Sequence, residues 1–270
     1  MNEPTTPPDH AVSDELMVER RGHVLVATMN RPERMNALSP QLHQDMRDTW
    51  KAVQSDAGVR AIVITGAGTR AFCAGMDLQA HAQRGGPPPA QDNVRDELRT
   101  TPLAYGLWLP TVVAVNGVCT GSGLHFVADA DFVLASSTAT FLDTHVSVGQ
   151  VAALEPISLV PRIGLGNALR LAVLGRHGRV DAAEALRMSL VDEVVEPERL
   201  LDRAVELGEQ MATGSPAAIE VSKRAIRASL DRPMSEAMQY GWELLLAHRD
   251  HPDSLEGPKA FVEKREARWH

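Results

Sequence analysis

The chain has 270 residues, of which 44% are hydrophobic and 23% are charged, and its formal net charge is −8 at pH 7. This length and apolar content suffice for one large domain, or for a domain with a helical extension, around a substantial core. The acidic charge disfavours a general nucleic-acid binder, because a phosphate backbone requires a basic surface. A small anionic ligand is still allowed, since a few local Lys or Arg residues suffice for it.

The sequence lacks the patterns of export, membrane insertion and metal binding. The first residues, MNEPTTPPDHAVSDE, contain acids and prolines but no apolar signal-peptide core, and no run approaches the roughly 18–20 apolar residues of a membrane span. The two cysteines, Cys73 and Cys119, form no spacing typical of a metal site, and neither do the eight histidines other than His125 and His145. We therefore expect a cytoplasmic protein with reduced cysteines, no metal, no cofactor of its own, and no nucleic-acid or membrane partner.

Strand and helix patterns alternate through the first part of the chain. VLVATMN (24–30) is a β-branched strand pattern, and Ser39-Pro40 opens a helix pattern that runs to about residue 53. A short helix pattern begins near Gly121–Gly123. The other predicted strands are VRAIVITG (59–66), TVVAVNG (111–117) and DFVLASS (131–137). This alternation predicts an α/β fold.

From Pro197 onward the strand patterns disappear and only helices are predicted. Their expected ranges are 197–212, 216–231, 234–249 and 254–269. RGGPPPAQDN (84–93) is typical of a mobile loop. The sequence thus predicts a disordered tail over 1–13, a core over 14–196 and a helical region over 197–270.

One glycine-rich segment resembles a dinucleotide-binding turn. ITGAGTRA satisfies G-x-G-x-x-A through Gly66, Gly68 and Ala71, directly after a predicted strand. Such a turn opens a long helix at once and is followed, about twenty residues later, by a strand that ends in an acidic residue. Here FCAGMD follows instead, and Asp92 lies in the proline-rich stretch. An ordinary turn is therefore favoured, and a nicotinamide-dependent oxidoreductase is the least favoured hypothesis.

Two further glycine-containing breaks each join a strand pattern to a helix pattern. They are AFCAGMDL (71–78) and NGVCTGSGLH (116–125). Such breaks present free main-chain N–H groups, and two of them facing one point would stabilise an oxyanion. Either break alone is equally typical of a simple helix start. The ordered pair is more specific for a binding site.

Four ordered segments carry a family resemblance. NRPERMNALS, IVITGAGTRAFCAGMDL, PTVVAVNGVCTGSG and LEGPKAFVEKREARW resemble the enoyl-CoA hydratase/isomerase (crotonase) family, over residues from about 15 to 269. The resemblance implies an α/β crotonase-like spiral of ββα units with a C-terminal helical oligomerisation region, assembled as trimers or dimers of trimers. It also implies an acyl-CoA thioester substrate, whose thioester oxygen accepts hydrogen bonds from the N–H groups of Met76 and Ser122.

The chain departs from the family at the proton-handling positions. Hydratases of this family use two glutamates about twenty residues apart, and the matching residues here are His125 and His145. Imidazole exchanges protons near neutral pH, so hydration stays possible. A neutral imidazole supplies no negative charge, and next to an oxyanion it would act as a hydrogen-bond donor. This property suits the polarisation of a carbonyl, or the orientation of water for thioester hydrolysis. Asp143 would orient His145 or replace it, since extended residues 141–145 would place both side chains on one face. Glu155 is a third candidate carboxylate.

The resemblance also implies contacts with coenzyme A. Arg31 and Arg34 lie where the family's first loop meets the CoA phosphates, and Phe261 and Lys264 match residues that line the CoA site, often from a neighbouring subunit. The alternative roles are surface charge for Arg31 and Arg34, helix packing for Phe261, solvation for Lys264, and turn formation for Asp77 and Leu78. The residues expected around CoA are Arg31, Arg34, Ala74, Asp77, Leu78, Phe261 and Lys264.

These observations favour an acyl-CoA-processing enzyme of acyl-chain breakdown. The leading hypothesis is an enoyl-CoA hydratase, which adds water to a 2-enoyl-CoA, with His at both usual Glu positions. The alternative is a non-hydratase protein of the same fold: an acyl-CoA isomerase, a thioester hydrolase or a catalytically silent acyl-CoA binder.

Overall fold

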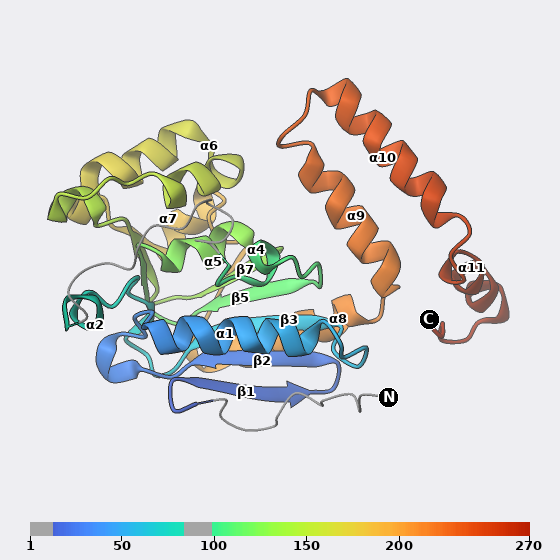
Figure 1. Cartoon of the computed structure of the whole chain (residues 1–270), viewed down its shortest axis with the longest axis horizontal. Coiled ribbons are helices and arrows are strands. Elements are labelled where there is room, and N and C mark those ends of the chain that lie inside the picture. The colour runs from blue at the N-terminus through green and yellow to red at the C-terminus, as the bar shows by residue number, and fades with distance from the viewer. Residues whose placement is uncertain (1–12, 84–98) are drawn as a thin grey trace.

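The computed structural model describes residues 13–83 and 99–270. The predicted loop over 84–93 and the predicted tail up to residue 12 lie outside these ranges. The larger sheet has the strand order β1-β2-β3-β5-β7-β10, and the smaller sheet has the order β4-β6-β8-β9 (Figure 1). The larger sheet comprises β1 (Leu16–Arg21), β2 (Val24–Met29), β3 (Ala61–Gly66), β5 (Thr111–Val115), β7 (Phe132–Ser136) and β10 (Glu193–Val195). The smaller sheet comprises β4 (Ala71–Cys73), β6 (Val118–Thr120), β8 (Thr140–Leu142) and β9 (Val180–Asp181).

Both sheets are mixed, with one antiparallel pair at an edge of each. In the larger sheet β1 and β2 are antiparallel and the other neighbours are parallel; in the smaller sheet only β8 and β9 are antiparallel. From β3 to β8 the chain alternates between the larger and the smaller sheet, so that each turn supplies one strand to each. This arrangement confirms the predicted α/β spiral. The strands of the smaller sheet were not predicted, because two or three residues are too few to form a recognisable alternation.

The helices follow the predicted order, with additions between residues 78 and 187. The first part of the chain contains α1 (Pro40–Val53), α2 (Leu78–Gln83), α4 (Pro102–Tyr105), α5 (Gly123–Asp129), α6 (Leu154–Leu174) and α7 (Ala182–Arg187). The C-terminal part contains α8 (Leu200–Ala212), α9 (Pro216–Ala228), α10 (Met234–His248) and α11 (Asp253–Glu263). Ser39 caps α1 as predicted, because its hydroxyl accepts a hydrogen bond from Leu42 N at 3.0 Å. The last helix ends earlier than predicted, where Lys264 adopts a left-handed conformation.

The central strands of the larger sheet are buried on both faces. Every residue of β3 is buried, which is what its nearly continuous apolar run predicts. On one face Val24, Val63 and neighbouring residues pack against Leu200 and Ala204 of α8. On the other face, alternate residues of the same strands join a larger core that includes Trp50 of α1. The central strands are therefore held rigidly between two helical layers.

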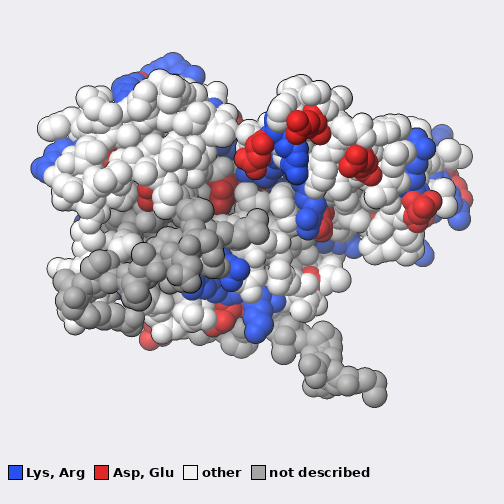
Figure 2. All heavy atoms as spheres, turned by 45° about the horizontal axis from the view of Figure 1, so that its top comes forward, with Lys and Arg blue, Asp and Glu red and all other residues white. Residues whose placement is uncertain are grey.

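Helix α6 contradicts the expectation that no apolar run approaches the length of a membrane span. By length and composition the segment Leu154–His177 is long and apolar enough to cross a membrane. Its helix is kinked at Gly164, whose φ and ψ are 74° and 160°, and Arg162 within it pairs with Asp192 at 3.0 Å. The segment also exposes apolar side chains, and the surface over α6 is largely uncharged (Figure 2). These side chains include Ile157, Leu165, Leu169 and Val173.

Helices α9, α10 and α11 stand beside the main body and do not cover its sheets (Figure 1). Lys223 of α9 ties them to the core: its ammonium donates to Leu109 O at 2.7 Å and to Asp131 Oδ2 at 2.6 Å. Burial lowers the pKa of Lys223, and the neighbouring Asp131 carboxylate only partly offsets this effect. A desolvated ion pair therefore joins the helical extension to the residues that precede β5 and β7.

Replacing Lys223 tests this anchor. Lys223→Met keeps most of the side-chain volume but removes the charge, so Asp131 keeps only the more distant Arg227, at 4.0 Å, as a cationic partner. The unfolding free energy should therefore fall by about 1–3 kcal/mol. Chemical denaturation measures this change, and hydrogen exchange should become faster in α9. The exposed Lys51→Met is the control and should change the unfolding free energy by less than about 0.5 kcal/mol. Equal stability of the two variants would contradict the assigned anchor.

Candidate active site

Two glycine-containing loops meet at one edge of the smaller sheet. Strands β4 and β6 pair in parallel, with Cys73 opposite Cys119, so the loops that follow them leave the sheet side by side. Gly75 and Gly121 have φ values of +84° and +53°, which glycine adopts most readily. A Cβ atom on Gly75 would lie 3.2 Å from Thr120 O and 3.3 Å from Ser122 N. The two loops are therefore in direct contact, and glycine permits their close approach.

The residue after each of these glycines has a free main-chain N–H group. Among residues 13–83 and 99–270, neither the N–H of Met76 nor that of Ser122 donates a hydrogen bond to a protein oxygen. Bonds on either side hold the first loop: Leu38 N donates to Gly75 O at 2.8 Å, and Asp77 N donates to Leu38 O at 3.0 Å. Two fixed, unpaired donors in touching loops are what an oxyanion site requires. The predicted donors are thus brought together.

Asp143 fixes the ring of His145. The carboxylate of Asp143 is fully buried, and its Oδ1 lies 2.8 Å from His145 Nδ1 and accepts a hydrogen bond from His145 N at 2.9 Å. This hydrogen bond raises the pKa of His145 above its ordinary value, although partial burial acts in the opposite direction. Residues 141–145 were expected to be extended. They are not extended throughout, because a 3₁₀ turn begins at His145. This turn brings ring and main-chain nitrogen to the same carboxylate oxygen.

Glu155 lies between the two histidines. It belongs to the first turn of α6, and its Oε1 lies 3.5 Å from Nε2 of His125 in α5 and 3.9 Å from Nε2 of His145. Burial acts to raise the pKa of Glu155, but the interaction with His125 and the proximity of His145 outweigh it, and the pKa falls below its usual value. Asp143, His145, Glu155 and His125 therefore form one continuous acid–base cluster.

The cluster lies beside the two N–H donors. A Cβ atom on Gly121 would lie 3.6 Å from Gly75 Cα and 3.8 Å from His145 Cε1. The imidazole of His145 therefore faces the junction of the two loops that carry Met76 and Ser122. The structure brings all four predicted acid–base residues and both predicted donors into one site. Their catalytic roles stay predictions.

The fold also creates a grouping that sequence spacing did not reveal. Asp143, His145 and Glu155 each offer one ligand atom, and these atoms lie within 4.8 Å of one another. Glu155 of α6 meets the residues that follow β8 only through tertiary packing, so no short sequence motif predicts this group. Within the described part of the chain, Asp143 Oδ2 is also buried without a hydrogen-bond partner. The site therefore offers metal-type ligands, which the sequence analysis did not predict.

The residues expected at the first CoA loop have clear structural partners. The Arg31 guanidinium donates to Ala37 O at 2.6 Å and to Asp77 Oδ2 at 2.8 Å. Asp77 accepts a hydrogen bond from Ala80 N at 3.0 Å and so caps α2. Burial acts to raise the pKa of Asp77, but this hydrogen bond and Arg31 together lower it. Arg34 donates to the side chain of Gln79. These contacts order the loop before α2, and contact with CoA stays a prediction.

The other residues expected around CoA fall into two places. Ala74 and Leu78 flank the Met76 donor: Ala74 N donates to Met35 O at 3.0 Å, and Leu78 is exposed at the start of α2. Phe261 and Lys264 lie at the end of α11, on the opposite side of the molecule from α2 (Figure 1), and Phe261 is 85% exposed. One chain therefore does not bring α11 to the acid–base cluster.

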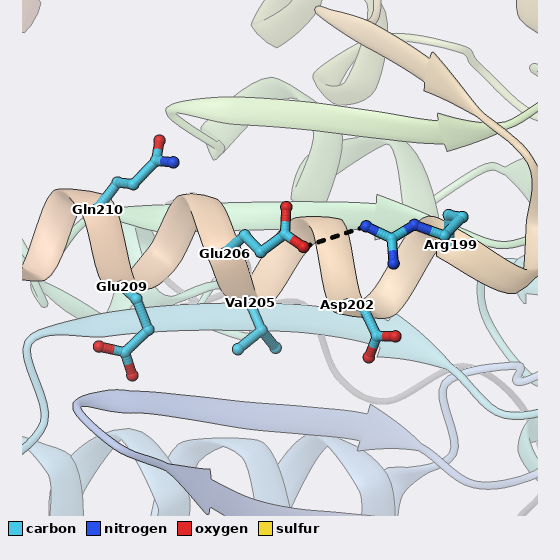
Figure 3. Close-up of a pocket in the computed structure, with 6 residues that line it drawn as sticks. All are labelled: Arg199, Asp202, Val205, Glu206, Glu209 and Gln210. Carbon is cyan, nitrogen blue, oxygen red and sulfur yellow. Dashed lines mark hydrogen bonds and ion pairs between the residues drawn. The ribbon is translucent and has the colours of Figure 1, made fainter.

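A separate surface pocket lies along α8 and contains none of the predicted site residues (Figure 3). Three acidic side chains, Asp202, Glu206 and Glu209, line it, and Arg199 pairs with Glu206 at 3.1 Å. The remaining lining residues are Val205 and Gln210. An acidic lining repels the phosphates of coenzyme A. The pocket is therefore not an alternative location for the CoA site.

Comparison with known proteins agrees with the predicted family. The family described as "Enoyl-CoA hydratase/isomerase" matches residues 19–270. (E)-benzylidenesuccinyl-CoA hydratase of Thauera aromatica is 35% identical over 251 residues, which cover 92% of this chain and 96% of that protein. Enoyl-CoA hydratase EchA19 of Mycobacterium tuberculosis is 34% identical over 255 residues, 93% of this chain and 94% of that protein. Carnitinyl-CoA dehydratase of Escherichia coli is 32% identical over 262 residues, 96% and 99% of the two chains.

Solved structures give the same result. An enoyl-CoA hydratase/isomerase from Mycobacterium paratuberculosis superposes with a TM-score of 0.87 at 35% identity, covering 95% of this chain and 98% of that one. Fold and site together define an α/β protein with two free main-chain N–H donors beside an acid–base cluster. This chain belongs to the enoyl-CoA hydratase/isomerase (crotonase) family. It is accordingly an acyl-CoA enzyme of the hydratase-like type.

The contact between Asp143 and His145 predicts a titration behaviour. Asp143→Asn removes the negative charge that stabilises the imidazolium, so the pKa of His145 should fall towards or below 6.5. NMR titration of the histidine ring protons measures it, with the surface residue His23 as an internal control that should not change. Because the folded-state pKa is raised, the stabilising effect of the pair is complete below about pH 6.5 and is lost as the pH rises through the folded-state pKa. An unchanged His145 titration would contradict the assigned hydrogen bond.

Proposed function

We propose that this protein is an enoyl-CoA hydratase, which adds water across the double bond of a 2-enoyl-CoA. The observation that carries the proposal is the position of Glu155, whose carboxylate faces both imidazoles beside the free N–H groups of Met76 and Ser122. Hydration requires a base for water, an acid for Cα and donors for the enolate oxygen. The cluster and the two N–H donors beside it contain groups suited to each of these tasks.

The pKa directions divide the work between Glu155 and His145. Glu155, with a lowered pKa, is ionised at neutral pH and accepts a proton from the attacking water, whose oxygen bonds to Cβ. The electron pair of the double bond moves to the thioester oxygen, where the N–H groups of Met76 and Ser122 stabilise the enolate. His145, with a raised pKa, donates its proton to Cα. Glu155 then returns a proton to His145 across 3.9 Å, directly or through a water molecule.

The names of the similar proteins suggest which acyl groups to test as substrates of this protein. Two of them are named for substituted substrates, benzylidenesuccinyl-CoA and carnitinyl-CoA, and each is a hydratase or dehydratase. We therefore propose testing aryl-substituted and branched 2-enoyl-CoAs alongside crotonyl-CoA. Loss of the conjugated enoyl absorbance measures hydration directly. A reaction in cytoplasmic acyl-chain breakdown, without a nucleic-acid or membrane partner, fits this proposal.

Thioester hydrolysis is a second candidate, and a specific observation favours it. An imidazole held by a buried carboxylate, as His145 is held by Asp143, is well placed to activate water against a carbonyl carbon. The same two N–H donors would stabilise the resulting oxyanion. Release of free CoA thiol distinguishes this reaction from hydration, which leaves the thioester intact. Acyl-CoA binding without either reaction would instead indicate a silent binder.

We further propose a homotrimer or a dimer of trimers. Helix α10 exposes Met234, Met238, Trp242 and Leu245, which recur at three- and four-residue intervals and so share one face. Phe261 and Val262 of α11 are exposed too. A continuous apolar face of this kind requires a covering surface. A second copy would supply it, and would also bring Phe261 and Lys264 to the CoA of a neighbouring site.

Replacing Glu155 tests the proposed base. Glu155→Gln keeps the shape but cannot accept the proton of water, so kcat for hydration should fall by about 10²–10⁴. His145→Ala should cause a loss in the same range. The exposed Glu198→Gln, in the turn before α8, is the matched control and should retain kcat. Full hydration activity in Glu155→Gln would exclude it as the base, and thiol release without hydration in the parent protein would favour the hydrolase.

Substitutions on α10 test the assembly. Light scattering of the parent protein at micromolar concentration should give the mass of a trimer or a hexamer. Met238→Glu with Trp242→Glu places charges on the apolar face and should dissociate the oligomer, because a buried unpaired charge costs several kcal/mol. Gln239→Glu adds a charge beside that face and should leave the mass unchanged. A monomeric parent protein would refute the proposed assembly.

A further inference from the structure

Ser122 carries the only side chain in the turn between β6 and α5. Its neighbours are glycines for conformational and steric reasons: Gly121 has a φ of +53°, and a Cβ atom on Gly123 would lie 2.8 Å from Cys73 O and 3.0 Å from Cys73 Cβ. Ser122 itself has a φ of −57° and a ψ of −16°, which any residue except proline adopts without strain. Of these three positions, the backbone therefore favours a side chain only at 122, and the chain places a hydroxyl group there.

This hydroxyl group is free and open to a ligand. Among residues 13–83 and 99–270, Ser122 Oγ forms no hydrogen bond. A serine at a helix start usually caps the helix by accepting a hydrogen bond from an N–H group two or three residues later. Here His125 N donates to the main-chain oxygen of Ser122 at 3.2 Å, and Oγ forms no cap. Ser122 is partly exposed, and its Oγ is not shut off from solvent as the unpartnered hydroxyl of Thr120 is.

Covalent geometry places the hydroxyl beside the free N–H group of the same residue. Three bonds join Oγ to N, so the staggered rotamers keep these two atoms roughly 3–4 Å apart. An oxygen that accepts a hydrogen bond from Ser122 N, at about 2.9 Å, therefore comes within reach of Oγ by rotation about one bond. The Met76 donor belongs to the neighbouring loop, which Gly75 brings into contact with Ser122. Two N–H groups and one hydroxyl group thus lie around one point.

A third donor acts mainly when negative charge has developed on the bound oxygen. A thioester carbonyl oxygen has two lone pairs, and the N–H groups of Met76 and Ser122 suffice to occupy them. The oxygen of an enolate carries negative charge and a further electron pair, so it accepts a third and stronger hydrogen bond. An interaction that is stronger in the transition state than with the bound substrate raises kcat and has little effect on substrate affinity.

We propose that the Ser122 hydroxyl is a third donor to the thioester oxygen and completes the oxyanion site formed by the N–H groups of Met76 and Ser122. The hydroxyl donates a hydrogen bond and keeps its proton. This inference rests on the reaction proposed above, since that reaction supplies the enolate; the oxyanion of thioester hydrolysis would use the same donor. Ser122 therefore has two donors, and a side-chain substitution removes one while leaving the other.

Ser122→Ala tests the hydroxyl, because it removes Oγ and keeps the main-chain N–H group. The kcat for hydration of crotonyl-CoA should fall at least about tenfold, towards the 10²–10³ that the loss of an oxyanion donor usually causes. The KM should change by less than about twofold. Ser122→Thr retains a hydroxyl group and should recover most of the lost rate. The exposed Ser137→Ala, directly after β7, is the matched control and should retain kcat.

Acetoacetyl-CoA gives a readout that does not depend on turnover. Its enolate is a conjugated anion with its own ultraviolet absorbance, so a pH titration measures how strongly the protein favours the bound enolate. Ser122→Ala should raise the pKa of the bound ligand by about one unit or more, a tenfold loss of enolate stabilisation. The affinity for saturated butyryl-CoA should stay within about twofold. Circular dichroism and thermal unfolding identify a variant that fails to fold, and Ser122→Gly provides a second variant without the hydroxyl.

The outcomes distinguish this inference from the proposed function. A folded Ser122→Ala protein with the kcat and enolate stabilisation of the parent overturns the third donor, while hydration stands. Equal losses of enolate and butyryl-CoA affinity also overturn it, because Ser122 would then only shape the site. If the parent neither hydrates nor hydrolyses an acyl-CoA, but Ser122→Ala selectively weakens enolate binding, the proposed function fails and the third donor is supported. A parent protein that binds neither ligand overturns both.

Discussion

The close approach of Gly75 to the Thr120–Ser122 loop is the constraint on which the site depends. A Cβ at Gly75 would stand only 3.2–3.3 Å from two main-chain atoms of that loop, while φ is also positive there. Any larger residue would meet both a steric and a conformational penalty. The contact fixes the separation of the Met76 and Ser122 donors before any ligand arrives. Such preorganised donors need no rearrangement when negative charge develops.

Sequence patterns sufficed to predict the central strands, the capped helix α1 and the four C-terminal helices. These elements are long enough to show their periodicity. The nearly continuous apolar run of β3 and the Ser39-Pro40 cap were readable for this reason. Strands of two or three residues, such as β8 and β9, leave no such pattern. They are set by pairing with neighbours that are distant in sequence, so only the folded chain defines them.

The candidate site was predictable in content but not in arrangement. The family resemblance placed His125 and His145 at the proton-handling positions and singled out Asp143 and Glu155. It did not reveal that Glu155 lies between the imidazoles, since that position depends on how the first turn of α6 meets α5. In this chain the carboxylates of Asp143 and Glu155 lie next to the histidines, as their hydrogen-bond and ion-pair partners. The cluster thereby combines two negative charges with two groups able to carry protons near neutral pH.

The order of the strands in the smaller sheet has a consequence for how the protein folds. Strand β4 pairs with β6, and β6 with β8, so each pairing joins segments separated by an intervening strand of the larger sheet. Ala71 meets Val118, and Val118 in turn meets Thr140. Such long-range parallel pairings form slowly, because a long loop must close before any bond rewards it. The loops of the candidate site follow these strands and therefore acquire their shape only after the chain as far as β8 is available for pairing.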